Sequence, residues 1–188
     1  MATGGTGTGG MGTGGVGTGG AAGACASLKI NEVQVATTAS ADQEFVELYN
    51  PCTTPVSLNG YRLVYRAQTA GIDTTVATFT TGTISSQGFW LVSSANYFPG
   101  GMQDTAFGIN VHFADTAGGV GLRDPSAALI DSVGYGTGVT NGLIEGGLAA
   151  SAPPAGQSIV RRPDGHDSNS NNVDFSVAVI PSPRSSNQ

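Results

Sequence analysis

Residues 44–51 read Glu-Phe-Val-Glu-Leu-Tyr-Asn-Pro, and this stretch decides the fold class. Phenylalanine, valine and tyrosine suit the pleated, half-buried surface of a β-sheet. Asn50-Pro51 ends the run, because proline has no backbone N–H to donate to a neighbouring strand. The stretch is therefore predicted to be a strand. One of its faces carries Phe45, Glu47 and Tyr49, and the other carries Glu44, Val46 and Leu48.

The two glutamates of this strand are the first candidates for a site, because a charge inside an apolar strand must reach water or a partner. Glycosidase chemistry needs two carboxylates lining one cleft, and strand alternation puts these two on opposite faces. We expect structural ion pairs instead, formed with the arginines of a strand predicted at residues 61–66. The residues predicted to form these pairs are Glu44, Glu47, Arg62 and Arg66.

The rest of the chain after residue 27 also shows the residue patterns of strands and turns. Residues 28–35 alternate in polarity at first and are predicted to form an antiparallel hairpin with 44–50. No stretch shows the spacing of three and four residues that marks a helix. Many short strands with frequent turn signals predict an all-β sandwich or barrel. Further strands are predicted at 76–80, 89–93, 119–123, 129–135, 158–162 and 174–177.

The first 24 residues differ from the remainder and contain 12 of the 30 glycines. Residues 4–20 repeat a five-residue unit, Gly-Gly-Thr-Gly-Thr, Gly-Gly-Met-Gly-Thr and Gly-Gly-Val-Gly-Thr, followed by Gly-Gly. The segment is either a flexible tether or a joining arm that packs as an extended strand against a sheet edge or another copy. We therefore divide the chain into a glycine-rich arm at 1–24 and a β-domain at 25–188.

Charge is sparse and excludes several partners. Only 11% of residues are charged, against about 25% in typical domains, and the net charge is −6. A nucleic-acid binder needs a basic face, so we expect no nucleic-acid partner. No run is long and apolar enough for membrane insertion, and no signal-peptide pattern precedes Cys25. We expect an extracellular or cell-surface protein whose signal peptide has been removed.

Cys25 and Cys52 are the only two cysteines. One lies just before the first predicted strand, and the other lies just after the second. If these strands form an antiparallel hairpin, the two positions are side by side, which favours a disulfide between Cys25 and Cys52. Such a bond would stabilise the fold by about 3–4 kcal/mol in the chain-entropy model.

With these pieces in order, the chain resembles the bacterial extracellular members of the lamin-tail domain family. The resemblance rests on Leu-Lys-Ile-Asn-Glu-Val at 28–33, Glu-Phe-Val-Glu-Leu-Tyr-Asn at 44–50, Leu-Asn-Gly-Tyr-Arg-Leu at 58–63 and Phe-Trp-Leu-Val at 89–92. Later pieces are Ile-Asp-Ser-Val-Gly-Tyr-Gly at 130–136 and Gly-Gln-Ser-Ile-Val-Arg at 156–161. The resemblance implies an immunoglobulin-like β-sandwich that binds other proteins, and it supplies no catalytic residues. The resemblance does not account for the insertion at 136–156.

Two sets of residues bear on chemistry. His112 and His166 are the only histidines and lie in neither a nucleophile elbow nor a metal-binding pair, so we expect no enzyme and no obligatory cofactor. The loop at 164–174 is rich in oxygen donors, which calcium prefers. The same residues could instead close turns on their own backbone. The candidate calcium ligands are Asp164, Asp167, Asn169, Asn171 and Asp174.

The sequence thus favours a non-catalytic extracellular binding or structural module. Its expected partners are proteins, copies of itself included, or a cell-surface polymer, and its glycine-rich arm would join subunits. Two alternatives remain at this point. One is an accessory domain of a secreted or surface-anchored hydrolase, and the other is a calcium-dependent adhesion module.

Overall fold

The stretch that decides the fold class forms an antiparallel hairpin, as predicted. β2 (Phe45–Tyr49) pairs with β1 (Lys29–Gln34), with Val46 opposite Val33. The structure is a computed structural model that describes Met1, residues 27–97 and residues 102–188. The glycine-rich repeat, Cys25 and the loop tip at 98–101 lie outside the described residues, so what the sequence predicts for them stays a prediction.

The remaining elements are strands with one short helix. In chain order they are β3 (Val56–Ser57), β4 (Arg62–Ala67), β5 (Thr74–Thr78), β6 (Thr83–Ile84), β7 (Phe89–Ser93), β8 (Thr105–Ala106), β9 (Ala117–Arg123), β10 (Leu129–Gly136), β11 (Ser158–Arg161), α1 (Asn171–Asp174) and β12 (Phe175–Ala178). Every strand of more than two residues falls on a stretch predicted from the sequence. α1 has only four residues, too few to leave a helical spacing in the sequence. Among the described residues, no helix has the length and apolar character needed to cross a membrane.

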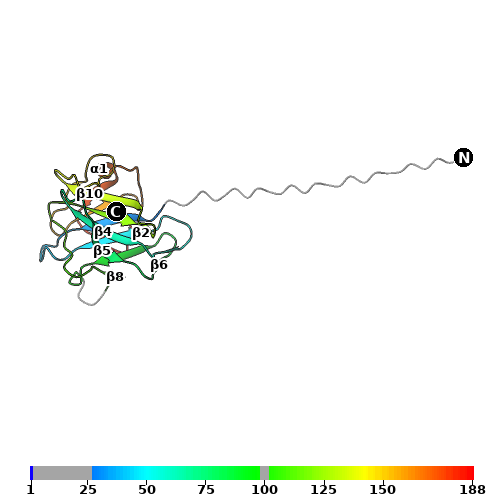
Figure 1. The fold of residues 1–188 in the computed structure, drawn as a ribbon, viewed down its shortest axis with the longest axis horizontal. Helices are drawn as coiled ribbons and strands as arrows, with labels where there is room; N and C mark the ends of the chain where they lie inside the picture. Colours follow the sequence, from blue (N-terminus) through cyan, green and yellow to red (C-terminus); the bar gives the residue numbers. More distant parts are fainter. Residues whose placement is uncertain (2–26, 98–101) are drawn as a thin grey trace.

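Two main sheets form the sandwich. One has six strands in the order β12-β11-β1-β2-β7-β8, and the other has four in the order β10-β9-β4-β5. The pairings are antiparallel except that of β7 with β8. Figure 1 shows these strands crossing the body of the molecule, with α1 and β8 at opposite ends. The all-β sandwich predicted from the sequence is confirmed.

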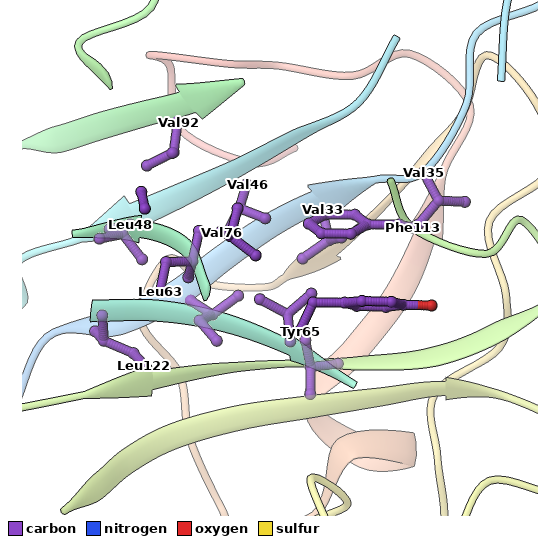
Figure 2. Packing of buried hydrophobic residues seen from close by; sticks show 14 of the residues in the cluster. Val33, Val35, Val46, Leu48, Leu63, Tyr65, Val76, Val92, Phe113 and Leu122 are labelled. Carbon is purple, nitrogen blue, oxygen red and sulfur yellow. The ribbon is translucent and has the colours of Figure 1, made fainter. Parts of the chain in front are cut away.

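The core lies between the inner faces of the two sheets. Val33 and Val46 of the six-stranded sheet are fully buried, as are Leu63 and Leu122 of the four-stranded sheet. Figure 2 shows these side chains meeting between the layers, with the ring of Tyr65 stacked on Phe113. Full burial of one valine or leucine contributes about 1.5–3 kcal/mol, so this apolar interior is the main source of stability.

The insertion at 136–156 packs on the outer face of the four-stranded sheet. Leu143 is fully buried there, over Gly119 and Gly121 of β9. Asn141 donates to the carbonyl oxygen of Arg66 at 3.1 Å. Glycine is needed at these outward-facing positions, because a Cβ on Gly119 would lie 2.9 Å from the Cβ of Leu143. The insertion therefore covers β9, where the glycines leave room for its side chains.

Candidate functional site

A fully buried arginine closes one end of the sandwich. Arg161 lies on the same face of β11 as the core residue Ile159, and its side chain has no exposed surface. Its Nε donates to the carbonyl oxygen of Ile30 at 2.9 Å, and Nη1 donates to that of His166 at 2.7 Å. The guanidinium lies 4.4 Å from the ring centre of Phe175, a favourable cation–π contact. Arg161 thus joins three segments of the chain.

Carboxylates from three places surround this guanidinium. Asp131, on the inner face of β10, lies 3.0 Å from Nη2, so this ion pair links the two sheets. Asp174 and Asp167 lie 3.2 Å and 3.3 Å from Nη1, and Glu145 lies 3.8 Å from Nη2. Lys29 adds a second cation that contacts Asp131 at 3.6 Å and also Asp167. We call this set the Arg161 cluster: Lys29, Asp131, Glu145, Arg161, Asp167 and Asp174.

The protonation of the cluster follows from its charges, four carboxylates against two cations. Burial raises the pKa of Asp131 to about 7, against the attraction of Arg161 and Lys29. Burial and the charge of Asp167 raise the pKa of Glu145. Burial alone would raise the pKa of Asp174, but hydrogen bonds from Ser168 and Ser170 and the charge of Arg161 lower it. The cluster therefore favours the protonated form of Asp131 and Glu145 more than water would, whereas it favours the ionised form of Asp174.

The loop that was the candidate calcium site is built around this cluster. The carboxylate of Asp174 accepts hydrogen bonds from the backbone N–H groups of Ser168 and Ser170 at 3.0 Å and 3.1 Å. Asp167 accepts one from the N–H of Asn169 at 3.0 Å, which closes a turn on its own backbone. These contacts favour the turn role of the loop, because they use the oxygen atoms that calcium would need.

The five predicted calcium ligands do not converge on one point. Asp167 and Asp174 come together, but around the guanidinium of Arg161. Asp164 accepts instead from the Asn31 side chain and the Asn187 N–H, both at 3.0 Å. Asn169 takes part through its backbone, and its φ of 57° is left-handed. Asn171 lies against β10, where its side chain accepts from the N–H of Gly134 at 2.9 Å and donates to the carbonyl of Ser132 at 2.8 Å.

A different set of acids is close enough to be considered for a metal. Oxygen atoms of Asp131, Glu145 and Asp167 lie within 4.8 Å of one another. Arg161 contacts all three, at 3.0, 3.8 and 3.3 Å, and Lys29 contacts two of them. The side chains of the protein therefore supply the positive charge at this point.

A second group of buried acids lies on the outer face of the six-stranded sheet. Glu32 of β1 and Glu47 of β2 stand directly opposite each other, and both are fully buried. The C-terminal residues 182–187 cover them. Glu32 accepts from the N–H of Ser182 at 3.0 Å, and Glu47 accepts from the N–H of Arg184 and from the side chain of Asn31 at 3.3 Å. Burial is the main cause that raises the pKa of Glu32, and it raises that of Glu47 to about 8.

Glu44 faces the interior. Its side chain is fully buried and accepts a hydrogen bond from the N–H of Phe113. Burial raises its pKa to about 8, and the charges of Asp42 and Asp115 act in the same direction. Its second carboxylate oxygen has no hydrogen-bond partner among the described residues. Glu44 is therefore a neutral acid at neutral pH that fixes the chain next to Phe113.

The predicted glutamate–arginine pairs are wrong. Arg62 and Arg66 lie on the outer face of the four-stranded sheet, whereas Glu44 faces the interior and Glu47 lies on the outer face of the six-stranded sheet. The side chains therefore point to different surfaces. Arg66 pairs with Asp73 at 2.7 Å, and Asp73 also contacts Arg123 at 2.6 Å. Arg62 stands opposite Arg123 in the sheet and takes no part in an ion pair among the described residues.

Sequence reasoning missed the residues at the centre of both groups, Arg161, Asp131 and Glu32. Each is a charged residue within an otherwise apolar strand, the same signal that drew attention to Glu47. Their partners come from segments more than 100 residues apart in places, such as Ile30 with Asp131 at 2.6 Å. Strand alternation predicts a face for each side chain, but it does not predict which distant segment covers that face. Cys52 is buried at the end of β2, and its predicted partner lies outside the described residues.

Comparison with known proteins identifies relatives of the fold. The family model described as Lamin Tail Domain matches residues 21–137. Among solved structures, a DUF4876 family protein from Bacteroides thetaiotaomicron is similar, with a TM-score of 0.59, 11% identity, and coverage of 85% of this chain and 73% of that one. No curated protein matches. At this level of identity the structural similarity concerns the fold.

Proposed function

This chain belongs to the lamin tail domain family, and from that premise we propose that it is a non-catalytic extracellular β-sandwich module that acts by binding. In this proposal it is a surface or matrix subunit, and the glycine-rich arm at 1–24 joins it to its neighbours. Its partners are proteins, further copies of the chain included.

The observation that carries the proposal is the way β1 is anchored at the point where the arm enters the domain. Lys29 is the first residue of β1 and contacts Asp131 and Asp167. The N–H of Ile30 donates to Asp131 at 2.6 Å, and its carbonyl accepts from Arg161. A pull on the arm would thus be spread over β10, β11 and the loop at 164–174. An anchored entry point suits a joining arm better than an incidental terminal extension.

Two further features support a binding role. Buried acids such as Glu32, Glu47 and Asp174 accept hydrogen bonds from backbone N–H groups, which suits a structural task. The low charge of the chain and the predicted disulfide between Cys25 and Cys52 support an extracellular location.

Light scattering after size-exclusion chromatography, with negative-stain microscopy, tests this proposal. The full chain is expected to form species larger than a monomer, and deletion of residues 2–20 is expected to leave a folded monomer. Circular dichroism of the deletion variant checks that the sandwich persists. A full chain that stays monomeric at every concentration would overturn the joining role and favour an accessory domain of a larger surface protein.

A further inference from the structure

The six-stranded sheet ends at β12, a short strand whose outer edge carries no charged side chain. The sheet order places β12 outermost, paired on one side with β11. The N–H of Phe175 bonds back to the carbonyl of Asn171, but from Ser176 to Ala178 no described residue outside β11 bonds to the backbone. No charged residue occurs between Asp174 and Arg184. Exposed edges of natural sheets are commonly blunted by charge, because unpaired N–H and C=O groups attract further strands.

The edges of the four-stranded sheet, in contrast, receive hydrogen bonds from other segments. Along β10, Asn171 and Glu145 accept from the N–H groups of Gly134 and Ser132, at 2.9 Å and 3.1 Å. Farther along, Ala150 exchanges two backbone hydrogen bonds of 2.8 Å with Gly134 and Gly136. At β5, the carbonyl of Val76 accepts from the N–H of Gly108 at 2.7 Å. Loops thus bond along β10 and reach β5 at Val76, whereas no described residue outside β11 bonds to the backbone of β12 from Ser176 to Ala178.

Apolar side chains flank the open edge. Val173, Val179 and Ile180 are 66%, 72% and 81% exposed, on both sides of β12. A hollow of 520 Å³ lies beside them. Its apolar lining is Val177, Val179, Ile180 and Pro181, and its polar lining is Arg162, Ser182, Ser185, Ser186 and Gln188. An open strand edge with an apolar hollow is the surface that binds an extended peptide by adding it to the sheet, with main-chain bonds along the edge and a side chain in the pocket.

We propose that the β12 edge binds the glycine-rich arm of another copy of this chain as an added strand. This inference rests on the proposed joining role of the arm. Within the repeat, Met11 and Val16 are single apolar residues with glycine on both sides. Glycine lets the arm approach the exposed Val179 and Ile180 closely, and the methionine or valine enters the hollow. The arm carries no charge, and neither does the stretch 175–183 that holds β12 and the residues after it.

Two geometric reasons favour the arm of a neighbour over the chain's own arm. The arm precedes β1 in the chain, and β12 runs parallel to β1, two strands away. To pair with β12 of its own chain, the arm would have to turn back before β1 and pass two strands. The predicted disulfide would also hold Cys25 near Cys52, which follows β2 on the side of β1 away from β12.

Cysteine trapping tests the pairing in the full chain. One chain carries Met11→Cys and a second carries Ile180→Cys, and the two are mixed and oxidised mildly. We expect a cross-linked dimer on a non-reducing gel, lost on reduction. The matched control replaces Ile180→Cys by Ile109→Cys, because Ile109 is also exposed, at 93%, and follows β8, the strand at the opposite end of the sheet from β12. Cross-linking no stronger than with this control would overturn the proposal. A double Met11→Cys, Ile180→Cys chain that cross-links only within itself would also overturn it.

Light scattering separates this inference from the proposed function. The exposed-site variant Val179→Lys with Ile180→Lys is expected to lose the larger species while remaining folded, and Ile109→Lys is expected to retain them. If deletion of residues 2–20 abolishes assembly but the double lysine variant does not, the arm joins copies elsewhere, and only the edge inference fails. If the full chain does not assemble at all, both fail.

Discussion

At the scale of single residues, this fold depends on charged side chains that have lost contact with water. Arg161 compensates for its burial through four hydrogen bonds, to two carbonyl oxygens and the carboxylates of Asp131 and Asp167, and through the face of Phe175. A buried ion pair adds little net stability over a well-packed apolar alternative, but removing one partner leaves the others uncompensated. The cluster therefore specifies which segments meet, and removing one of its residues is expected to lower the free energy of unfolding by several kcal/mol.

Replacing Arg161→Met is expected to lower the free energy of unfolding by about 3–5 kcal/mol, because the buried Asp131 and Asp174 would lose the guanidinium that they contact. Urea unfolding at neutral pH measures this change. Arg162→Met is the matched control, since Arg162 is exposed and its replacement should stay within about 0.5 kcal/mol. A loss as small for Arg161 as for Arg162 would contradict the assigned role.

Glu47 makes the stability depend on pH in a direction opposite to that of most carboxylates. Its pKa is raised from 4.5 to about 8 in the folded chain. Between these values the folded state binds a proton that the unfolded state has released, so the free energy of unfolding falls as pH rises. Below pH 4.5 this contribution is complete. Acids with lowered pKa, such as Asp174, act only at lower pH.

We therefore expect Glu47→Gln to reduce the loss of stability between pH 5 and pH 8. Glutamine keeps an oxygen that accepts the N–H of Arg184 but cannot ionise beside Glu32 and Asp164. The reduction should be at least about 1 kcal/mol, the equivalent of one unit of pKa. Urea unfolding at both pH values measures it. Equal losses in the variant and the original chain would mean that Glu47 is not protonated in the folded state.

At the scale of elements, the insertion at 136–156 and the loop at 164–174 behave as parts of the sandwich. Both lie against the four-stranded sheet and contribute polar groups to β10 or β4. Their packing depends on backbone surfaces without side chains, which only particular glycines provide.

Gly119→Ala is expected to destabilise the fold by about 1–3 kcal/mol, because its Cβ would lie 2.9 Å from Leu143 and from Asn141 and would displace the insertion. Limited proteolysis should show faster cleavage within 136–156. Gly71→Ala is the control, since a Cβ there meets nothing within 4 Å. Unchanged stability and cleavage in Gly119→Ala would refute the packing argument.

The loop at 164–174 is expected to be insensitive to calcium. Its carboxylates already accept backbone N–H groups and contact Arg161, so an ion has no oxygen set to bind. The melting temperature should be the same with EDTA and with excess calcium, because only a ligand that binds the folded state raises it. A higher melting temperature with calcium than with EDTA would restore the alternative of a calcium-dependent adhesion module.

At the scale of the whole molecule, the predicted disulfide decides how firmly the arm is attached. Cys25→Ala is expected to lower the free energy of unfolding by about 3–4 kcal/mol, because the bond closes a loop that includes the whole β1–β2 hairpin. Urea unfolding without reductant measures the loss. The unsubstituted chain with reductant should unfold like the variant. If reductant leaves the unsubstituted chain unchanged, the bond is absent.

The sequence by itself determined the strands of this protein and the hairpins between neighbouring strands. Alternation and turn residues in 28–35, 44–50 and 119–135 suffice to predict hairpins, because strand pairing between neighbours depends on local pattern. The same alternation correctly places Glu44 and Glu47 on opposite faces of their strand.

Only the tertiary structure decided what covers each face. Arg161 meets Asp131, Glu47 meets the backbone of Arg184, and Leu143 meets Gly119 through contacts between segments far apart in the chain. The pattern of one strand carries no information about the segment that packs on it. Any segment of suitable shape can bury a face, and any donor of suitable geometry can bond to a buried acceptor. For the same reason, the sequence shows that β12 is a strand, but only the sheet order shows that its outer edge is open.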